Sequence, residues 1–236
     1  MQHDAGDMQR KIINLPCCLF APLSDDWIIN VRGRAGNDGV TGTGQVVYGS
    51  EPRWETKLDL SGFGSDRVLT WRAISSQMRG RVNVLRVCVC DRHRTTWKKL
   101  GLPDPNKDGI PHSDGAGFSD GSTYRQDLTF VAPQTWTAGL SEIEFDPAQI
   151  ANALQPGQYF SHNDWLYRVT GIFDDGAVTR YTFEPPLRRS IPAGDEVSLK
   201  ATSLMVFETD LEGRMPLSMG KHGDTSISLL EWTNRP

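Results

Sequence analysis

Hydrophobic and polar residues alternate along several short segments, a pattern typical of β-strands with one buried face. In residues 53–60, RWETKLDL, the apolar or neutral residues Trp54, Thr56, Leu58 and Leu60 alternate with charged ones. A period of two places successive side chains on opposite faces of a sheet. Other short strand-like runs lie at residues 11–20, 26–32, 82–90, 123–132, 137–145, 156–173, 178–186, 195–200, 203–210 and 226–232. Together they predict a mainly β fold.

One segment has helical spacing instead. In residues 65–80, Trp71, Ile74 and Met78 recur three and four positions apart, so they share one face of a helix. We expect this face to pack against the strand predicted at residues 82–90. The sequence therefore predicts a single packed α-helix among the strands.

Two segments are rich in turn-forming residues. Residues 33–45 contain five glycines and predict a flexible loop, while Gly, Pro, Asp and Ser dominate residues 101–123. We therefore expect an N-terminal β-rich domain with the helix (1–100), a Gly/Asp/Pro-rich loop or linker (101–123) and a C-terminal β-barrel or sandwich (124–236).

Composition excludes some classes of protein. The chain has 236 residues and a net charge of −4, so it lacks the basic excess of proteins that coat nucleic acid. It contains no apolar run of membrane-spanning length and begins with a polar segment unlike a signal peptide. We expect a soluble cytoplasmic product whose partners are neither nucleic acid nor membrane.

The four cysteines form two close pairs, Cys17-Cys18 and Cys88 with Cys90. Neither pair has the two-residue spacing of a zinc knuckle. The favoured interpretation is buried, reduced cysteines that pack as small hydrophobic residues. A four-thiolate metal site joining the two pairs is the alternative.

A second candidate metal site begins at Asp104. Asp104, Asn106 and Asp108 match the first oxygen ligands of a calcium loop, and Gly109 matches its turn. The twelfth position, where a glutamate is required, is Gly115. We interpret the segment as ordinary turns, with calcium as a weak alternative, and expect no cofactor.

No group of residues indicates catalysis. The five histidines include no pair at metal-binding spacing, and Ser113-Asp114 beside His112 lacks the glycines of a nucleophile elbow. Glu142 and Glu144 alternate with apolar residues, as on a solvated strand face. We predict no catalytic residue and no enzymatic activity.

Five elements nevertheless recur in a familiar order. They are a strand bearing Trp54, a helix ending in Met78-Arg79-Gly80-Arg81, an Asp-Gly-rich loop with Asp114-Gly115 and Asp120-Gly121, the run Pro156 to Ser161 with Tyr167, and Pro185 to Arg188 with Gly194. Over about residues 40–232, this order resembles minor tail or tail-tip proteins of siphovirus-like bacteriophages. The last strands depart from the family pattern, because residues 203–210 lack its proline and arginine.

The resemblance implies a structural protein at the tail tip of the virion, made in the cytoplasm of the bacterial host. We expect a ring-forming adaptor that joins the tail tube to hub or fibres, with three or six copies per ring. Its partners would be itself and other phage tail proteins. The alternative is a module that binds a host receptor or surface glycan, with Trp97, Trp136 or Trp165 as stacking platforms.

The proline-rich connector at residues 184–194 supplies candidate interface residues. We expect it to project toward a neighbour, with Leu187 at its apolar tip and Arg188 and Arg189 reaching acidic groups. Asp114 and Asp120 of the long loop are further interface candidates. The alternative is a surface turn in which Leu187 packs on its own barrel.

Overall fold

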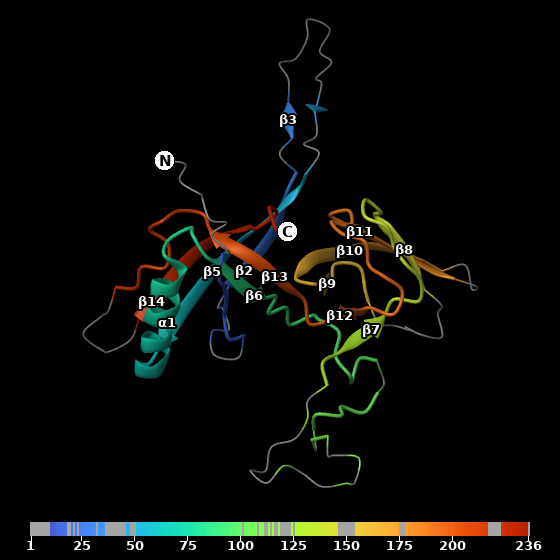
Figure 1. Ribbon diagram of the computed structural model, residues 1–236, viewed down its shortest axis with the longest axis horizontal. Coiled ribbons are helices and arrows are strands. Elements are labelled where there is room, and N and C mark those ends of the chain that lie inside the picture. Colours follow the sequence, from blue (N-terminus) through green and yellow to red (C-terminus); the bar gives the residue numbers. More distant parts are fainter. Residues whose placement is uncertain are drawn as a thin grey trace, which may run out of the picture. The chain divides into compact units, whose positions relative to one another are not determined.

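The chain is mainly β with a single helix in its described part, as predicted (Figure 1). The computed structural model describes residues 10–17, 20, 22, 24–31, 33–35, 46–47, 51–100, 102–107, 109–110, 113, 115, 118, 124, 126–145, 154–174, 178–216 and 223–235. Two compact units are present. Unit 1 comprises Met1–Cys90 and Ser203–Pro236, and unit 2 comprises Asp91–Thr202.

Unit 1 contains a six-stranded sheet built from both ends of the chain. Its order is β1 (Ile12–Asn14), β6 (Val84–Cys88), β13 (Thr202–Phe207), β14 (Gly223–Glu231), β5 (Arg53–Phe63) and β2 (Ser24–Asn30). The C-terminal β14 pairs antiparallel with β5. Residues 203–236 therefore belong with the N-terminal part of the chain, which differs from the predicted division at residues 100 and 124.

The alternating pattern in β5 has the expected effect. Trp54, Thr56, Leu58 and Leu60 are all buried, while the charged residues between them are partly or fully exposed. The helix α1 (Ser65–Met78) buries Trp71, Ile74 and Met78, as predicted. The helix packs on β1 and β5. The strand that was expected beneath the helix is β6, which lies next to β1 in the sheet.

Trp71 is at the centre of the core of unit 1. Its ring lies edge-on to Phe20 at 5.9 Å between centroids and 6.4 Å from Phe63, and its indole nitrogen donates to the carbonyl of Gly213 at 2.9 Å. Gly213 has a φ of 75°, and a Cβ there would lie 2.9 Å from the Trp71 ring. The glycine thus permits both the left-handed turn and the close approach of the ring.

The cysteines differ from the favoured interpretation. Cys17 and Cys88 form a disulfide with Cα atoms 5.8 Å apart, so they are not both reduced. Cys17, Cys88 and Cys90 are only partly buried, and Cys18 lies outside the described residues. The disulfide joins the chain after β1 to the end of β6, two strands that are already paired in parallel. It therefore reinforces one edge of the sheet.

Unit 2 contains the second six-stranded sheet. Its order is β7 (Thr129–Val131), β12 (Glu196–Ser198), β9 (Tyr159–His162), β10 (Trp165–Asp174), β11 (Thr179–Glu184) and β8 (Glu142–Phe145). A turn at Asn163-Asp164 joins β9 to β10, and both residues have positive φ, as a two-residue hairpin of this type requires. One face of the sheet packs on an apolar core that includes Phe160, Phe183 and Val197.

Two connecting segments complete unit 2. Residues 132–141 leave β7 for β8, and residues 185–195 leave β11 for β12. They are linked by backbone hydrogen bonds at Trp136 with Ile191, at Leu140 with Leu187, and at Ala132 with Gly194. Residues 132–141 run from one edge strand of the sheet, β7, to the other, β8, and the paired segments contribute Trp136, Leu187 and Ile191 to the core.

Replacing Trp71 with alanine should lower the free energy of unfolding of unit 1 by about 3–5 kcal/mol, because a large buried ring is removed and a cavity remains. Leu69, an exposed apolar residue of the same helix, provides the matched control. Leu69→Ala should change stability by less than about 0.5 kcal/mol. Urea unfolding followed by circular dichroism measures both, and equal midpoints for the two variants would contradict the packing described.

Candidate functional site

The connector at residues 184–194 does not project as expected. Leu187 is only 2% exposed and belongs to the core of unit 2. Its amide donates to the carbonyl of Leu140 at 2.7 Å, and its carbonyl accepts from Gly139 at 2.8 Å. The prediction of an apolar tip at Leu187 is therefore wrong, because long-range backbone pairing turns this side chain inward.

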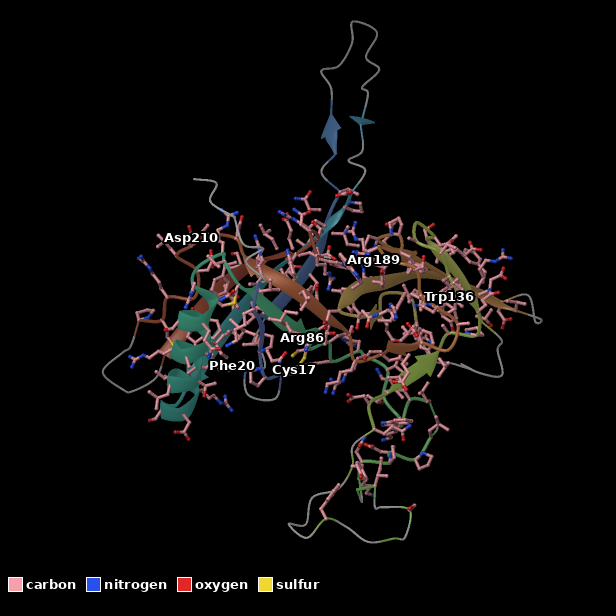
Figure 2. All side chains as sticks on the ribbon, in the orientation of Figure 1. Cys17, Phe20, Arg86, Trp136, Arg189 and Asp210 are labelled. Atoms are coloured by element: carbon pink, nitrogen blue, oxygen red, sulfur yellow. A yellow bond between two sulfur atoms is a disulfide. The ribbon has the colours of Figure 1, made fainter. Side chains whose placement is uncertain are left out.

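The two arginines of the connector have different environments. The backbone amide of Arg188 donates to the hydroxyl of Tyr167 at 3.1 Å, and its half-buried guanidinium lies 6.0 Å from the centre of the Trp165 ring. This cation–π geometry joins Arg188 to its own unit. Arg189 is exposed (Figure 2). Of the three interface candidates in the connector, Arg189 is the one whose side chain is mainly at the surface.

The tryptophans expected to stack on a glycan are not suitably exposed. Trp136 and Trp165 are buried, and Trp97 is half-buried. The Trp136 ring lies edge-on to Phe130 at 6.5 Å between centroids, so it is part of the core (Figure 2). Trp136 and Trp165 are therefore wrong as candidate stacking platforms.

The candidate calcium residues form a turn. Oδ1 of Asp104 accepts from the amide of Asn106 at 2.9 Å, as in an Asx turn. The side-chain amide of Asn106 donates to the carbonyl of Gln126 and accepts from its amide, both at 2.8 Å. These contacts favour the turn interpretation. Asp108, Asp114 and Asp120 lie outside the described residues.

Residues 102–126 contain some structure of their own. The backbones of Ile110 and Tyr124 exchange two hydrogen bonds, and the rings of Phe118 and Tyr124 meet edge-on at 5.0 Å between centroids. Phe118, Tyr124 and Leu102 are all exposed. This segment therefore presents apolar side chains to solvent beside a short antiparallel pairing, which is a feature of contact surfaces.

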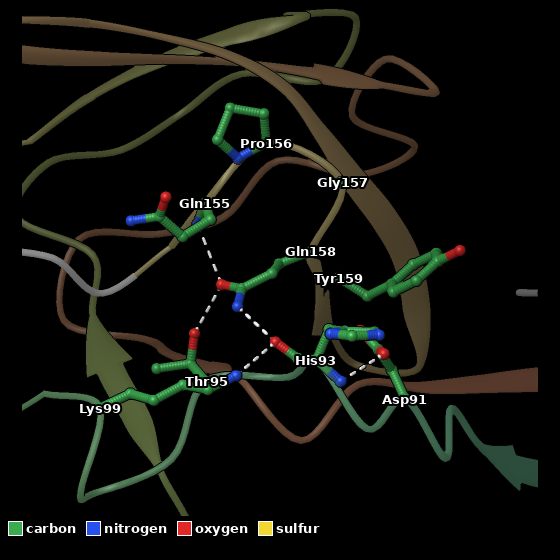
Figure 3. Close-up of a pocket in the computed structure, with 9 residues that line it drawn as sticks. All are labelled: Asp91, His93, Thr95, Lys99, Gln155, Pro156, Gly157, Gln158 and Tyr159. Atoms are coloured by element: carbon green, nitrogen blue, oxygen red, sulfur yellow. Dashed lines mark hydrogen bonds between the residues drawn. The ribbon is translucent and has the colours of Figure 1, made fainter.

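A polar pocket of about 860 Å³ lies where the chain enters unit 2 (Figure 3). It is lined by Asp91, His93, Thr95, Lys99, Gln155, Pro156, Gly157, Gln158 and Tyr159. Sequence patterns gave no signal for it, because its two walls are separated by more than fifty residues of chain and neither carries a recognised motif.

Gln158 holds the two walls of this pocket together. Its Oε1 accepts from the Thr95 hydroxyl at 2.6 Å and from the Gln155 amide at 2.9 Å, and its Nε2 donates to the carbonyl of His93 at 2.6 Å (Figure 3). Gln158 is 7% exposed. A buried amide with all these partners fixes the backbone of the entering segment.

The charged groups of the pocket also contact backbone atoms. Lys99 Nζ donates to the carbonyls of His93 and Arg94 at 2.8 Å, and Oδ1 of Asp91 accepts from the amide of His93 at 2.7 Å. These contacts fold residues 91–99 around the lysine. These hydrogen bonds position the backbone of residues 91–99. Among the residues that line the pocket, they do not pair a nucleophilic side chain with a general base.

A histidine that sequence patterns did not single out fixes the end of the connector. His162 Nε2 lies 3.1 Å from Oδ2 of Asp195 and 3.3 Å from Nδ2 of Asn163. His162 is buried at the end of β9, whereas Asp195 is partly exposed next to β12. The pair therefore ties the proline-rich connector to the β9–β10 hairpin.

The described residues contain no group of three or more His, Cys, Asp or Glu side chains that could hold a metal ion. In the same part of the chain, no helix is long and apolar enough to cross a membrane. No protein-family model matches the chain, and no curated protein matches it significantly.

Leu187→Ala should destabilise unit 2 by about 2–5 kcal/mol, because a core side chain is truncated. Arg189→Ala, two positions away and exposed, should change stability by less than about 0.5 kcal/mol. Thermal unfolding of the two variants tests this contrast. If the Leu187→Ala protein were as stable as the Arg189→Ala protein, the result would contradict the burial of Leu187 and support a connector that projects from the unit.

Gln158→Leu should cost about 2–4 kcal/mol, because the three hydrogen bonds that the buried Gln158 amide makes with Thr95, Gln155 and His93 are lost. Hydrogen exchange of the backbone amides at residues 93–100 should accelerate before the rest of unit 2. Gln155→Ala is the control, since its exposed side chain makes none of the pocket contacts described above. Equal exchange in both variants would show that Gln158 does not hold this segment.

Proposed function

We propose that this protein is a virion structural protein of a bacteriophage tail tip, a ring-forming adaptor that joins the tail tube to hub or fibres. The order of sequence elements that resembles minor tail proteins supports this proposal. One structural observation also supports the proposal, and it concerns the segment between β2 and β5.

The segment contains β3 (Arg34–Ala35) and β4 (Val46–Val47), which pair antiparallel and form a two-stranded sheet of their own. β2 and β5 are also paired, with Asn30 opposite Arg53. β3 and β4 thus lie in the chain segment that links β2 to β5 and form a sheet separate from theirs. We call the β3–β4 part the ribbon.

An isolated two-stranded ribbon is marginally stable in water, because both of its edges present unpaired backbone groups. A neighbouring copy of the chain can supply the missing contacts. In a closed ring each copy receives the ribbon of one neighbour and gives its own to the next, so every head-to-tail interface is satisfied. The exposed residues Phe118 and Tyr124 in unit 2 offer a second contact surface.

Removing the ribbon tests the adaptor function. A variant in which Asn-Gly replaces residues 34–49 keeps the register that places Asn30 opposite Arg53 and can close β2 and β5 with a two-residue turn. We expect the parent to form rings of three or six copies by light scattering, and the variant to remain a folded monomer with a melting temperature within about 4 °C of the parent.

Leu211→Ala serves as the control, because Leu211 is an exposed apolar residue of unit 1 outside the ribbon. This variant should form the same rings as the parent. A parent that stays monomeric at high concentration, or a ribbon-less variant that forms the same rings, would contradict the proposal.

A further inference from the structure

Unit 2 carries an exposed aromatic residue on a strand face that otherwise bears polar side chains. Phe173 of β10 is 61% exposed. It lies opposite Arg180 of β11, and Arg180 lies opposite Glu144 of β8. Residues that are paired in register share a face of the sheet. The inward face of the same three strands carries buried residues such as Tyr181, so Phe173 is on the outer face.

The Phe173 ring lies close to the backbone of its own strand at Gly171. A Cβ at Gly171 would lie 3.3 Å from a ring carbon of Phe173 and 2.8 Å from the Thr182 hydroxyl oxygen. The missing side chain at Gly171 therefore leaves room for the ring and the hydroxyl to lie close to the backbone. A glycine inside a strand commonly marks such a close approach.

Hydrogen-bonding groups that contact one another lie on the same sheet face as the ring. Arg180 Nε lies 2.7 Å from Oε1 of Glu142, and its terminal nitrogen lies 3.0 Å from Oε1 of Glu144. The three side chains are each about 45% exposed, so they also face solvent. The hydroxyl of Thr170 donates to that of Thr182 at 3.1 Å. Because the arginine is held by two carboxylates, its planar fork has a defined orientation.

From this geometry we infer that the outer face of β8, β10 and β11 binds a neutral glycan. A sugar ring has an apolar face of C–H groups, which can stack on an exposed aromatic ring, and hydroxyl groups around its rim. Carboxylates accept hydrogen bonds from such hydroxyls, while guanidinium and threonine groups donate to them. The described face presents both features side by side.

The charges of the face specify the kind of glycan. Two glutamates and one arginine give this cluster a net charge of −1, and the next cross-strand pair, Arg168 with Glu184, is balanced. An anionic sugar would meet a repulsive field here. A protein partner fits less well, because the core of a stable protein interface is depleted in charge and buries about 800 Å² on each side. Phe173 alone cannot supply such a core.

Calorimetric titration of the whole protein with cellohexaose, maltohexaose and chitohexaose tests the inference. At least one of these neutral hexasaccharides should bind with a Kd of about 1 mM or tighter. Phe173→Ala should weaken that binding at least about tenfold, and Phe173→Trp should retain it, because stacking requires an aromatic ring. The melting temperature of each variant should stay within about 3 °C of the parent, as expected for an exposed position.

Leu69→Ala is the matched control, because Leu69 is equally exposed but lies on α1 of unit 1. It should bind the sugar as the parent does. The inference is overturned if no neutral hexasaccharide binds with a Kd below about 10 mM, or if Phe173→Ala binds as tightly as the parent. It is also overturned if hexagalacturonate, an anionic probe, binds more tightly than every neutral sugar.

Loss of self-association in Phe173→Ala, without any sugar binding by the parent, would identify the face as a protein contact and would likewise overturn the inference. The glycan site does not rest on ring formation. A monomeric parent that binds sugar through Phe173 would contradict the adaptor proposal and leave this inference standing.

Discussion

The backbone hydrogen bonds between residues 132–141 and residues 185–195 are the constraint on which unit 2 depends. They join the segment that leaves the edge strand β7 to the segment that leaves the inner strand β11, and they bury Leu187 and Ile191 on the inner side of the sheet. Prolines in the connector are compatible with this pairing. Positions 185, 186 and 192 are proline, whereas the donating amides belong to other residues, including Leu187 and Ile191. Fixed φ angles at the prolines lower the conformational entropy that is lost when the segment is ordered.

β9 has a second organising role, because residues in and next to it hold both ends of the inserted unit. Gln158, directly before the strand, binds the entering chain at His93 and Thr95. Ser161, within β9, accepts a hydrogen bond from the amide of Thr202 at 3.0 Å, where the chain leaves the unit. Insertion of one compact unit into another is tolerated when its ends lie close together on a shared element. In unit 2 the entering and the leaving chain are both bound at β9 or at the residue directly before it.

Local patterns in the sequence predict part of this structure. The period of two in β5 and the helical spacing of Trp71, Ile74 and Met78 determine which side chains are buried, because each depends only on neighbouring residues. The pairing of β14 with β5 joins segments more than 160 residues apart. No local pattern encodes such a pairing, and for this reason the sequence alone does not show that residues 203–236 belong with the N-terminal part of the chain.

The same argument explains the errors at the candidate site. Two arginines and three prolines around Leu187 indicate an exposed turn when only neighbours are considered, yet the partner of Leu187 is Leu140, far away in the chain. Glu231 shows the converse case. It stands at an apparently ordinary polar position, but it is buried and accepts a hydrogen bond from the amide of Trp54 at 3.1 Å. Burial of a carboxylate with a backbone donor can be recognised only once the strands are placed.

The two proposed functions use different physical properties of the chain. The proposed assembly uses the ribbon, because an isolated two-stranded ribbon is marginally stable in water and would gain stability from a neighbour that pairs with it. The proposed sugar site on the outer face of unit 2 is the opposite, because Arg180 is bound to two carboxylates before any ligand arrives and Gly171 leaves room for the Phe173 ring. Weak ligands such as sugars require this preorganisation, since little binding energy is available to order side chains. Assembly and sugar binding therefore place separate demands on separate residues, and a change in one need not alter the other.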